Sequence, residues 1–111
     1  DSLPSRGLGD VYKRQLEWWD SLEAVPTINR LRSSLESIRA EELQKALSRM
    51  GPDFSARERK VVEALSKGII NKVLHTPVTA LRAPQQRSER QNSLLVVERL
   101  FDLAQDEDQD R

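Results

Sequence analysis

The sequence predicts an all-α protein, a helical bundle of about four helices, and three observations carry this prediction. Residues that favour helices, chiefly Leu, Ala, Glu, Arg, Lys and Gln, dominate the 111 residues. Almost no stretch alternates apolar and polar residues with period two, as half-buried strands do. The four glycines and five prolines are sparse, and several stand where an apolar stripe begins or ends.

Residues 1–15 are interpreted as a non-native, disordered scar. Residues 10–15, Asp-Val-Tyr-Lys-Arg-Gln, match the translation of a transposase mosaic-end adapter used in sequencing libraries. Segments added by cloning or assembly are excluded from fold reasoning. The alternative is a flexible native N-terminus. On the first interpretation the native chain begins near Leu16.

The first expected helix covers residues 16–22 and has the composition of a helix end. So short a helix is marginal alone, so we expect the native protein to continue upstream. Neighbouring helical residues differ by about 100° around the axis, so Trp18 and Trp19 cannot both face one core. One of them is expected at the surface or against another domain or subunit, where tryptophan is enriched.

A second helix is expected from Pro26 to about Met50. Proline is favoured in the first turn, where its missing N–H removes no hydrogen bond, and Gly51-Pro52 supplies a stop. Apolar residues recur at steps of three and four along this segment: Ile28, Leu31, Leu35 and Ile38, then Leu43, Leu47 and Met50.

A third helix is expected to begin after Ser55 and to run to about His75. Ser55 and Glu58 have the spacing of a capping box, in which each side chain accepts from the backbone N–H of the other. Thr76-Pro77 is expected to end the helix and to fix the direction of the exit. The helix carries a wide apolar stripe: Val61, Val62, Leu65, Ile69, Ile70, Val73 and Leu74.

A polar connection over residues 83–90 and a fourth helix complete the expected domain, which covers residues 16–105. Residues 106–111 form an acidic tail. The fourth helix is marked by Leu94, Leu95, Val97, Leu100, Phe101 and Ala104.

Composition excludes several functions. Eighteen basic and eighteen acidic residues cancel, which disfavours nonspecific binding to nucleic acid. The absence of cysteine removes disulfides, thiolate metal sites and cysteine nucleophiles. No apolar run approaches the ~20 residues that cross a bilayer, so we expect a soluble cytoplasmic protein without membrane contact.

His75 is the only histidine. It could act as a haem or metal ligand or a general base, or it could simply lie at a helix end, where the macrodipole favours a cation. A metal needs further ligands and a catalytic base needs an orienting partner, and the sequence offers neither as a cluster. We therefore predict no catalytic, cofactor-binding or metal-binding residue.

A pattern of residues identifies a known family. Asn71-Lys72-x-Leu-His75-x-Pro77, followed by Leu81-Arg82, comes after Pro26-Thr-Ile, Leu31-Arg32 and Glu42-Leu43. Their order resembles the C-terminal dimerisation domain of glutamyl-tRNA reductase, over residues 16 to about 103. Asn71, Lys72, His75, Pro77 and Arg82 are family markers, and we expect them to form a helix-to-loop corner or to contact the partner subunit.

The resemblance implies a larger parent enzyme. Such enzymes use NADPH to reduce glutamyl-tRNA to glutamate-1-semialdehyde in tetrapyrrole, and hence porphyrin and haem, biosynthesis. A catalytic domain, an NADPH-binding domain and a long spinal helix, whose last turns would be residues 16–22, precede this domain. V-shaped homodimers of the family leave room for tRNA and for the partner glutamate-1-semialdehyde aminotransferase.

We therefore predict that this chain mediates subunit association and, by itself, has no catalytic activity and no cofactor. A stand-alone helical adapter that binds another protein's helix is the alternative, and a small RNA-binding module is a third possibility that the balanced charge disfavours. The candidate dimer interface comprises Val62, Leu65, Ile69, Val73, Leu94, Val97, Leu100 and Phe101.

Overall fold

The computed structural model describes residues 2–103, without the side chains of residues 2–8, 10, 17 and 20, and every regular element among them is a helix. The helices are α1 (Ser2–Leu22), α2 (Val25–Met50), α3 (Ala56–Arg82) and α4 (Arg87–Leu100). The predicted all-α class with about four helices is confirmed. Residue 104 and the predicted acidic tail, residues 106–111, lie outside the described part of the chain.

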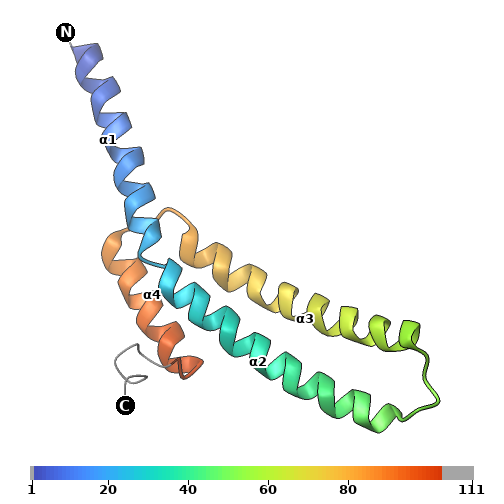
Figure 1. Cartoon of the computed structure of the whole chain (residues 1–111). Coiled ribbons are helices and arrows are strands. Elements are labelled where there is room, and N and C mark those ends of the chain that lie inside the picture. Colours follow the sequence, from blue (N-terminus) through green and yellow to red (C-terminus); the bar gives the residue numbers. More distant parts are fainter. Residues whose placement is uncertain (1, 104–111) are drawn as a thin grey trace.

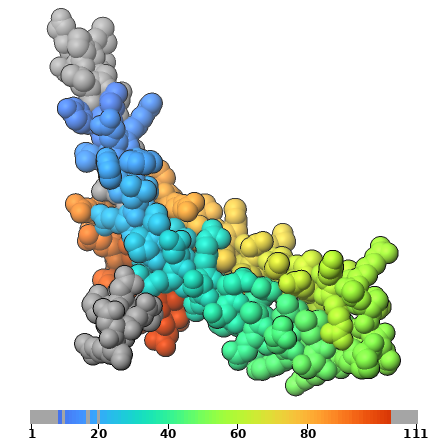
Figure 2. Space-filling view, viewed as in Figure 1, coloured from blue at the N-terminus to red at the C-terminus, as the bar shows by residue number. Residues whose placement is uncertain are grey.

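The molecule is elongated. Helices α2 and α3 run side by side as an antiparallel hairpin, α4 packs against the base of this hairpin, and α1 projects away from it (Figure 1). The chain extends over 76 × 36 × 20 Å, with a radius of gyration of 20.3 Å. A compact domain of this length has a radius of gyration of about 13 Å, so much of this chain is not folded onto itself (Figure 2).

Helix α1 begins at Ser2, and the disorder predicted for residues 1–15 is therefore not found in the backbone of residues 2–15. A physical reason is that helix growth upstream from residues 16–22 needs no new nucleation. The origin of residues 1–15 stays a prediction. Trp18 and Trp19 stack edge to face with ring centroids 4.9 Å apart, and both are more than half exposed.

Helix α2 begins and ends as predicted, to within one residue. Pro26 lies in its first turn, and Gly51 follows its last residue with φ 75°, a left-handed conformation that glycine adopts without strain. The Arg59 guanidinium from α3 donates to the carbonyl oxygen of Gly51 and, at 3.5 Å, to that of Leu47. This side chain thus satisfies carbonyl groups that the helix end leaves without partners.

The predicted capping box at the start of α3 is confirmed. The Glu58 backbone N–H donates to Ser55 Oγ at 3.1 Å, and the Ser55 N–H donates to Glu58 Oε1 at 2.8 Å. The predicted end near His75 is wrong, because α3 continues through Pro77 to Arg82. Burial outweighs the hydrogen bond that proline removes, since Val78 and Leu81 beyond it are both buried in the core.

Helix α4 begins at Arg87, inside the segment predicted to be a polar connection. Its Arg90 is only 1% exposed. The Arg90 guanidinium donates from Nε to the Leu81 carbonyl oxygen at 3.3 Å and from Nη2 to that of Ala83 at 2.7 Å. The early start of α4 thus places this arginine at the C-terminal end of α3.

The core lies at the base of the hairpin, where α2, α3 and α4 meet. It is formed by Ala24, Ile28, Leu31, Leu74, Val78, Leu81, Leu94 and Leu103. Further out the hairpin has almost no interior, because Leu43 is the only buried residue between Arg32 and Val73. The outer part of the hairpin therefore resembles half of a bundle.

Candidate self-association surface

An apolar groove runs between α2 and α3 in the outer part of the hairpin. Its volume is about 270 Å³. Its apolar lining comes from both helices: Ile38, Leu43 and Ala46 from α2, and Val62, Leu65, Ile69 and Ile70 from α3. Arg39, Glu42 and Ser66 supply its polar edge. A shallow groove with this lining suits apolar side chains from another helix.

A ridge of large apolar side chains borders this groove on α3. Val61, Leu65, Ile69 and Val73 are four residues apart and hence lie along one face of the helix. They are 63%, 62%, 53% and 48% exposed, respectively. Ile38, across the groove on α2, is also 53% exposed. Isolated exposed apolar residues are ordinary, but a continuous row of this kind marks an interaction surface.

The structure brings the α3 candidates from the sequence together. Leu65, Ile69 and Val73 are exposed on the ridge, and Val62 is half-buried in the groove. Ile38, Leu43 and Ala46 were not predicted to belong to the interface, because their helical spacing equally fits a core inside the chain. The structure distinguishes an interface from an internal core at these positions, because α3 covers only one side of α2.

Two of the four α4 candidates lie in or against the core of the chain. Leu94 is 9% exposed and belongs to the core, and Val97 packs against that core. These two residues are therefore occupied within the chain and offer a partner little surface. Leu100 and Phe101 are exposed, at 74% and 37%, and remain available for contact.

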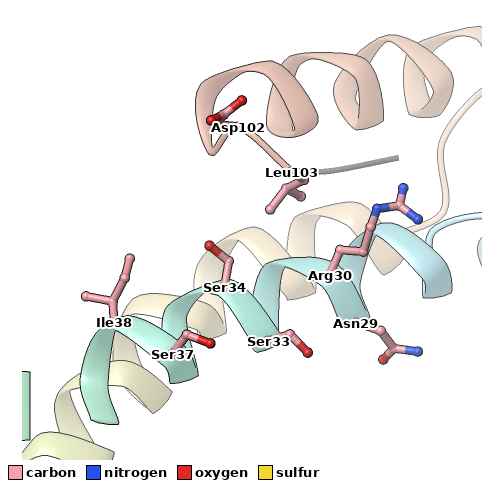
Figure 3. A pocket seen from close by; sticks show the side chains of 8 residues that line it. All are labelled: Asn29, Arg30, Ser33, Ser34, Ser37, Ile38, Asp102 and Leu103. Atoms are coloured by element: carbon pink, nitrogen blue, oxygen red, sulfur yellow. The ribbon is translucent and has the colours of Figure 1, made fainter. Parts of the chain in front are cut away.

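A hollow beside the end of α4 continues from the apolar groove, because Ile38 lines both. It has a volume of about 570 Å³ and lies between α2 and residues 102–103 (Figure 3). Small hydroxyl side chains from α2, those of Ser33, Ser34 and Ser37, line it together with Leu103, which points toward α2. It therefore extends the surface along which another helix could approach α2 closely.

Polar contacts fix how α2 sits against its neighbours. Arg30 Nη2 and Thr27 Oγ1 both donate to Glu98 Oε2, at 2.7 and 2.8 Å, and thus join α2 to α4. In the outer hairpin, Arg39 donates from Nε to Glu36 at 2.8 Å and from Nη1 to Ser66 at 3.2 Å. The Arg39 hydrogen bond lowers the pKa of the Glu36 carboxyl and raises the pKa of the arginine.

The family markers lie along α3. Asn71, Lys72, His75 and Arg82 are exposed, and Pro77 is half-buried inside the helix. The predicted helix-to-loop corner is thus replaced by a continuous helix. Asn71, His75 and Arg82 line one shared hollow with Arg32 of α2.

Two classes of site are not found within residues 2–103. Among the side chains that the structure describes, no group of three or more histidine, aspartate or glutamate residues is placed to hold a metal ion. No helix over the same residues is long and apolar enough to cross a membrane.

Comparison with known proteins matches this chain to one family, which is the family that the sequence resembles. A family model described as "Glutamyl-tRNAGlu reductase, dimerisation domain" matches residues 10–103. The matched range includes residues 10–15, which belong to the segment interpreted from the sequence as a scar.

Individual relatives agree with the family model. Glutamyl-tRNA reductase of Synechococcus sp. (strain WH7803) is 83% identical over 105 residues, which cover 94% of this chain and 24% of that protein. The enzyme of Synechococcus sp. (strain CC9605) is 86% identical over 88 residues, 79% of this chain and 20% of that protein. For Prochlorococcus marinus (strain MIT 9313) the identity is 85%, with the same coverage. The chain thus spans a fifth to a quarter of the length of these relatives.

Proposed function

The chain belongs to the family of glutamyl-tRNAGlu reductase dimerisation domains, and from this premise we propose that it holds two copies of its parent protein together through the apolar groove and the α3 ridge. The observation that carries the proposal is the row Val61, Leu65, Ile69 and Val73, four large apolar side chains about half exposed or more. Family membership favours this function over that of a stand-alone adapter.

Surface area supports the proposal. The chain has an accessible surface of 8686 Å², whereas a compact monomer of its mass of 12.7 kDa has about 6,200 Å². A stable interface of standard size needs about 800 Å² from each partner. The chain therefore exposes more surface than a compact monomer of its mass, and both the projecting α1 and the open hairpin contribute to the difference.

The shape of the hairpin indicates how two copies meet. The outer parts of α2 and α3 form a two-helix layer with only Leu43 buried, and two such layers facing each other form a four-helix bundle. In that bundle Leu65 and Ile69 of each copy enter the groove of the other. Arg39 lies at the edge of the groove, where its contacts with Glu36 and Ser66 hold α2 and α3 in register.

Sedimentation of the 111-residue chain tests the proposal. We expect a dimer, and we expect Ile69→Asp to raise its dissociation constant at least ~100-fold, because two carboxylates are then buried without partners. Leu95→Asp is the matched control: Leu95 is 62% exposed but lies on α4, away from the groove, so its dimer should persist. A wild-type chain that stays monomeric at high micromolar concentration would refute the proposal.

The parent protein's activity follows by the same proposal. Together with the segments that this chain lacks, it would reduce glutamyl-tRNA to glutamate-1-semialdehyde with NADPH in tetrapyrrole biosynthesis, in the cytoplasm. Contact with tRNA and with the aminotransferase that uses the product belongs to that larger assembly. The relatives are named glutamyl-tRNA reductase, which supports the reaction. An assay of the full-length protein with charged tRNA and NADPH tests it.

A further inference from the structure

A second groove lies between α2 and α3, nearer the base of the hairpin. It has a volume of about 350 Å³. We call it the cationic groove. Its polar lining consists of Arg32 from α2 and Asn71, His75, Thr79 and Arg82 from α3. The lining contains two guanidinium groups, an imidazole, an amide and a hydroxyl, but no carboxylate. Almost every polar group in it can donate a hydrogen bond.

This groove opens on a different side of α3 from the apolar ridge. Residues two apart in a helix differ by about 200° around its axis, so Asn71 points nearly opposite to Ile69, and His75 nearly opposite to Val73. A partner that covers the ridge therefore leaves the cationic groove free. The two surfaces can be occupied at the same time.

Within the described part of the chain, the two arginines of the groove make no polar contact that a ligand would have to displace, and in this they resemble Arg57 and Arg99. Among the described side chains, neither Arg32 nor Arg82 makes a hydrogen bond or ion pair. Other arginines are engaged: Arg30 with Glu98, Arg39 with Glu36 and Ser66, and Arg59 and Arg90 with carbonyl groups at helix ends. The Glu36 carboxylate lines an adjoining hollow with Arg32 and Asn71, but it is bound to Arg39.

We propose that the cationic groove binds a phosphate group through Arg32, His75 and Arg82. Guanidinium groups present paired N–H donors that match the oxygens of a phosphate. A tetrahedral phosphate carries oxygens on several sides and can therefore accept from α2 and α3 together, whereas a planar carboxylate has two oxygens only. Two chemical sources are compatible with the groove: the backbone of an RNA or a free phosphate compound.

The overall charge balance of the chain does not oppose this site. Eighteen basic and eighteen acidic residues cancel over the whole sequence, but phosphate recognition depends on charges within about one Debye length, ~8–10 Å in physiological salt. The lining of this groove is cationic although the chain is neutral. We therefore expect a local binding site and not a broad nucleic-acid surface.

The test measures two ligands with the 111-residue chain. Fluorescence anisotropy with labelled, uncharged tRNA at low salt measures the RNA source, and NMR titration with inorganic phosphate measures the small-molecule source. The double variant Arg32→Gln/Arg82→Gln removes both guanidinium groups from the groove. The matched control Arg57→Gln/Arg99→Gln removes two exposed arginines from other surfaces, so the two double variants have the same net charge.

We expect the groove variant to weaken binding at least ~10-fold and the control variant to weaken it less than ~3-fold. The groove variant should also reduce the salt dependence of RNA affinity by the amount that corresponds to about two lost phosphate contacts. Loss confined to tRNA assigns the RNA source, and loss of the inorganic phosphate response assigns the free source. Equal weakening by both double variants, or binding of neither ligand by the wild type, overturns the proposal. Sedimentation of the same samples shows whether self-association is intact, so failure here is distinguishable from failure of the dimer.

Discussion

Arg90 donates from Nη2 to the Ala83 carbonyl oxygen at 2.7 Å although its side chain is almost fully buried. Its Nε donates to the Leu81 carbonyl at 3.3 Å, so one guanidinium closes the C-terminal end of α3 from the first turns of α4. Nη1 is buried without a partner among the described residues. The negative end of the α3 macrodipole compensates the buried charge in place of a carboxylate.

Arg90→Ala should lower the free energy of unfolding by about 2–4 kcal/mol, because two carbonyl groups lose their donor and a cavity opens in the core. Chemical denaturation measures the change. Arg87→Ala is the control: its ion pair with Glu23 is 3.1 Å long, but its side chain is 67% exposed, so its loss should cost less than about 1 kcal/mol. Equal effects of the two substitutions would contradict this role for Arg90.

Ser55→Ala should cost about 1 kcal/mol, because the Glu58 N–H then loses its acceptor at the start of α3. Thermal unfolding by circular dichroism measures it. Ser88→Ala provides the comparison, since Ser88 is exposed in the first turn of α4 and makes no side-chain hydrogen bond within residues 2–103. If the two substitutions shift the melting temperature equally, the capping box does not stabilise α3.

The melting temperature should rise with protein concentration if the apolar groove is covered by a second copy. Binding that occurs only in the native state stabilises that state by mass action. A tenfold increase in concentration adds up to about 1.4 kcal/mol per mole of dimer. Differential scanning calorimetry over a hundredfold range measures this, and Leu65→Lys should abolish the dependence. A wild-type melting temperature that stays constant would count against self-association.

Local signals in the sequence were sufficient for most of the fold. Pro26, Gly51-Pro52 and the Ser55/Glu58 box are each read from residues within one helical turn, and the structure confirms all three. The predicted end of α3 near His75 was wrong, because it rested only on the local penalty for a proline inside a helix. The burial of Val78 and Leu81 against α4 outweighs that penalty, and it depends on residues far along the chain.

The candidate residues on α3 lie together on one surface, whereas two of the four on α4 lie in or against the core. Leu65 and Leu94 are both leucines in amphipathic helices, yet one is 62% exposed and the other 9%. Periodicity shows that a face is apolar but not which element covers it. Arg90 gave no signal, since an arginine in a polar segment is ordinarily exposed. Its burial results from the position of α4 across the end of α3.

Pro77→Ala should stabilise the chain by about 2–2.5 kcal/mol. Proline inside a helix removes the hydrogen bond to the carbonyl four residues earlier and costs about 3 kcal/mol. Replacing it by alanine raises the conformational entropy of the unfolded chain, which opposes folding by about 0.4–1 kcal/mol. The first term is larger because Pro77 lies inside α3. Denaturant titration of the variant measures the net change.

Pro26→Ala supplies a control of opposite sign. Pro26 lies in the first turn of α2, where its missing N–H removes no helical hydrogen bond, so alanine there changes chiefly the entropy of the unfolded chain. We expect it to destabilise the chain by about 0.5–1 kcal/mol. A helix that ended near His75 would make Pro77 behave like Pro26. The same sign for both substitutions would therefore restore the sequence-based end of α3, and opposite signs support the continuous helix to Arg82.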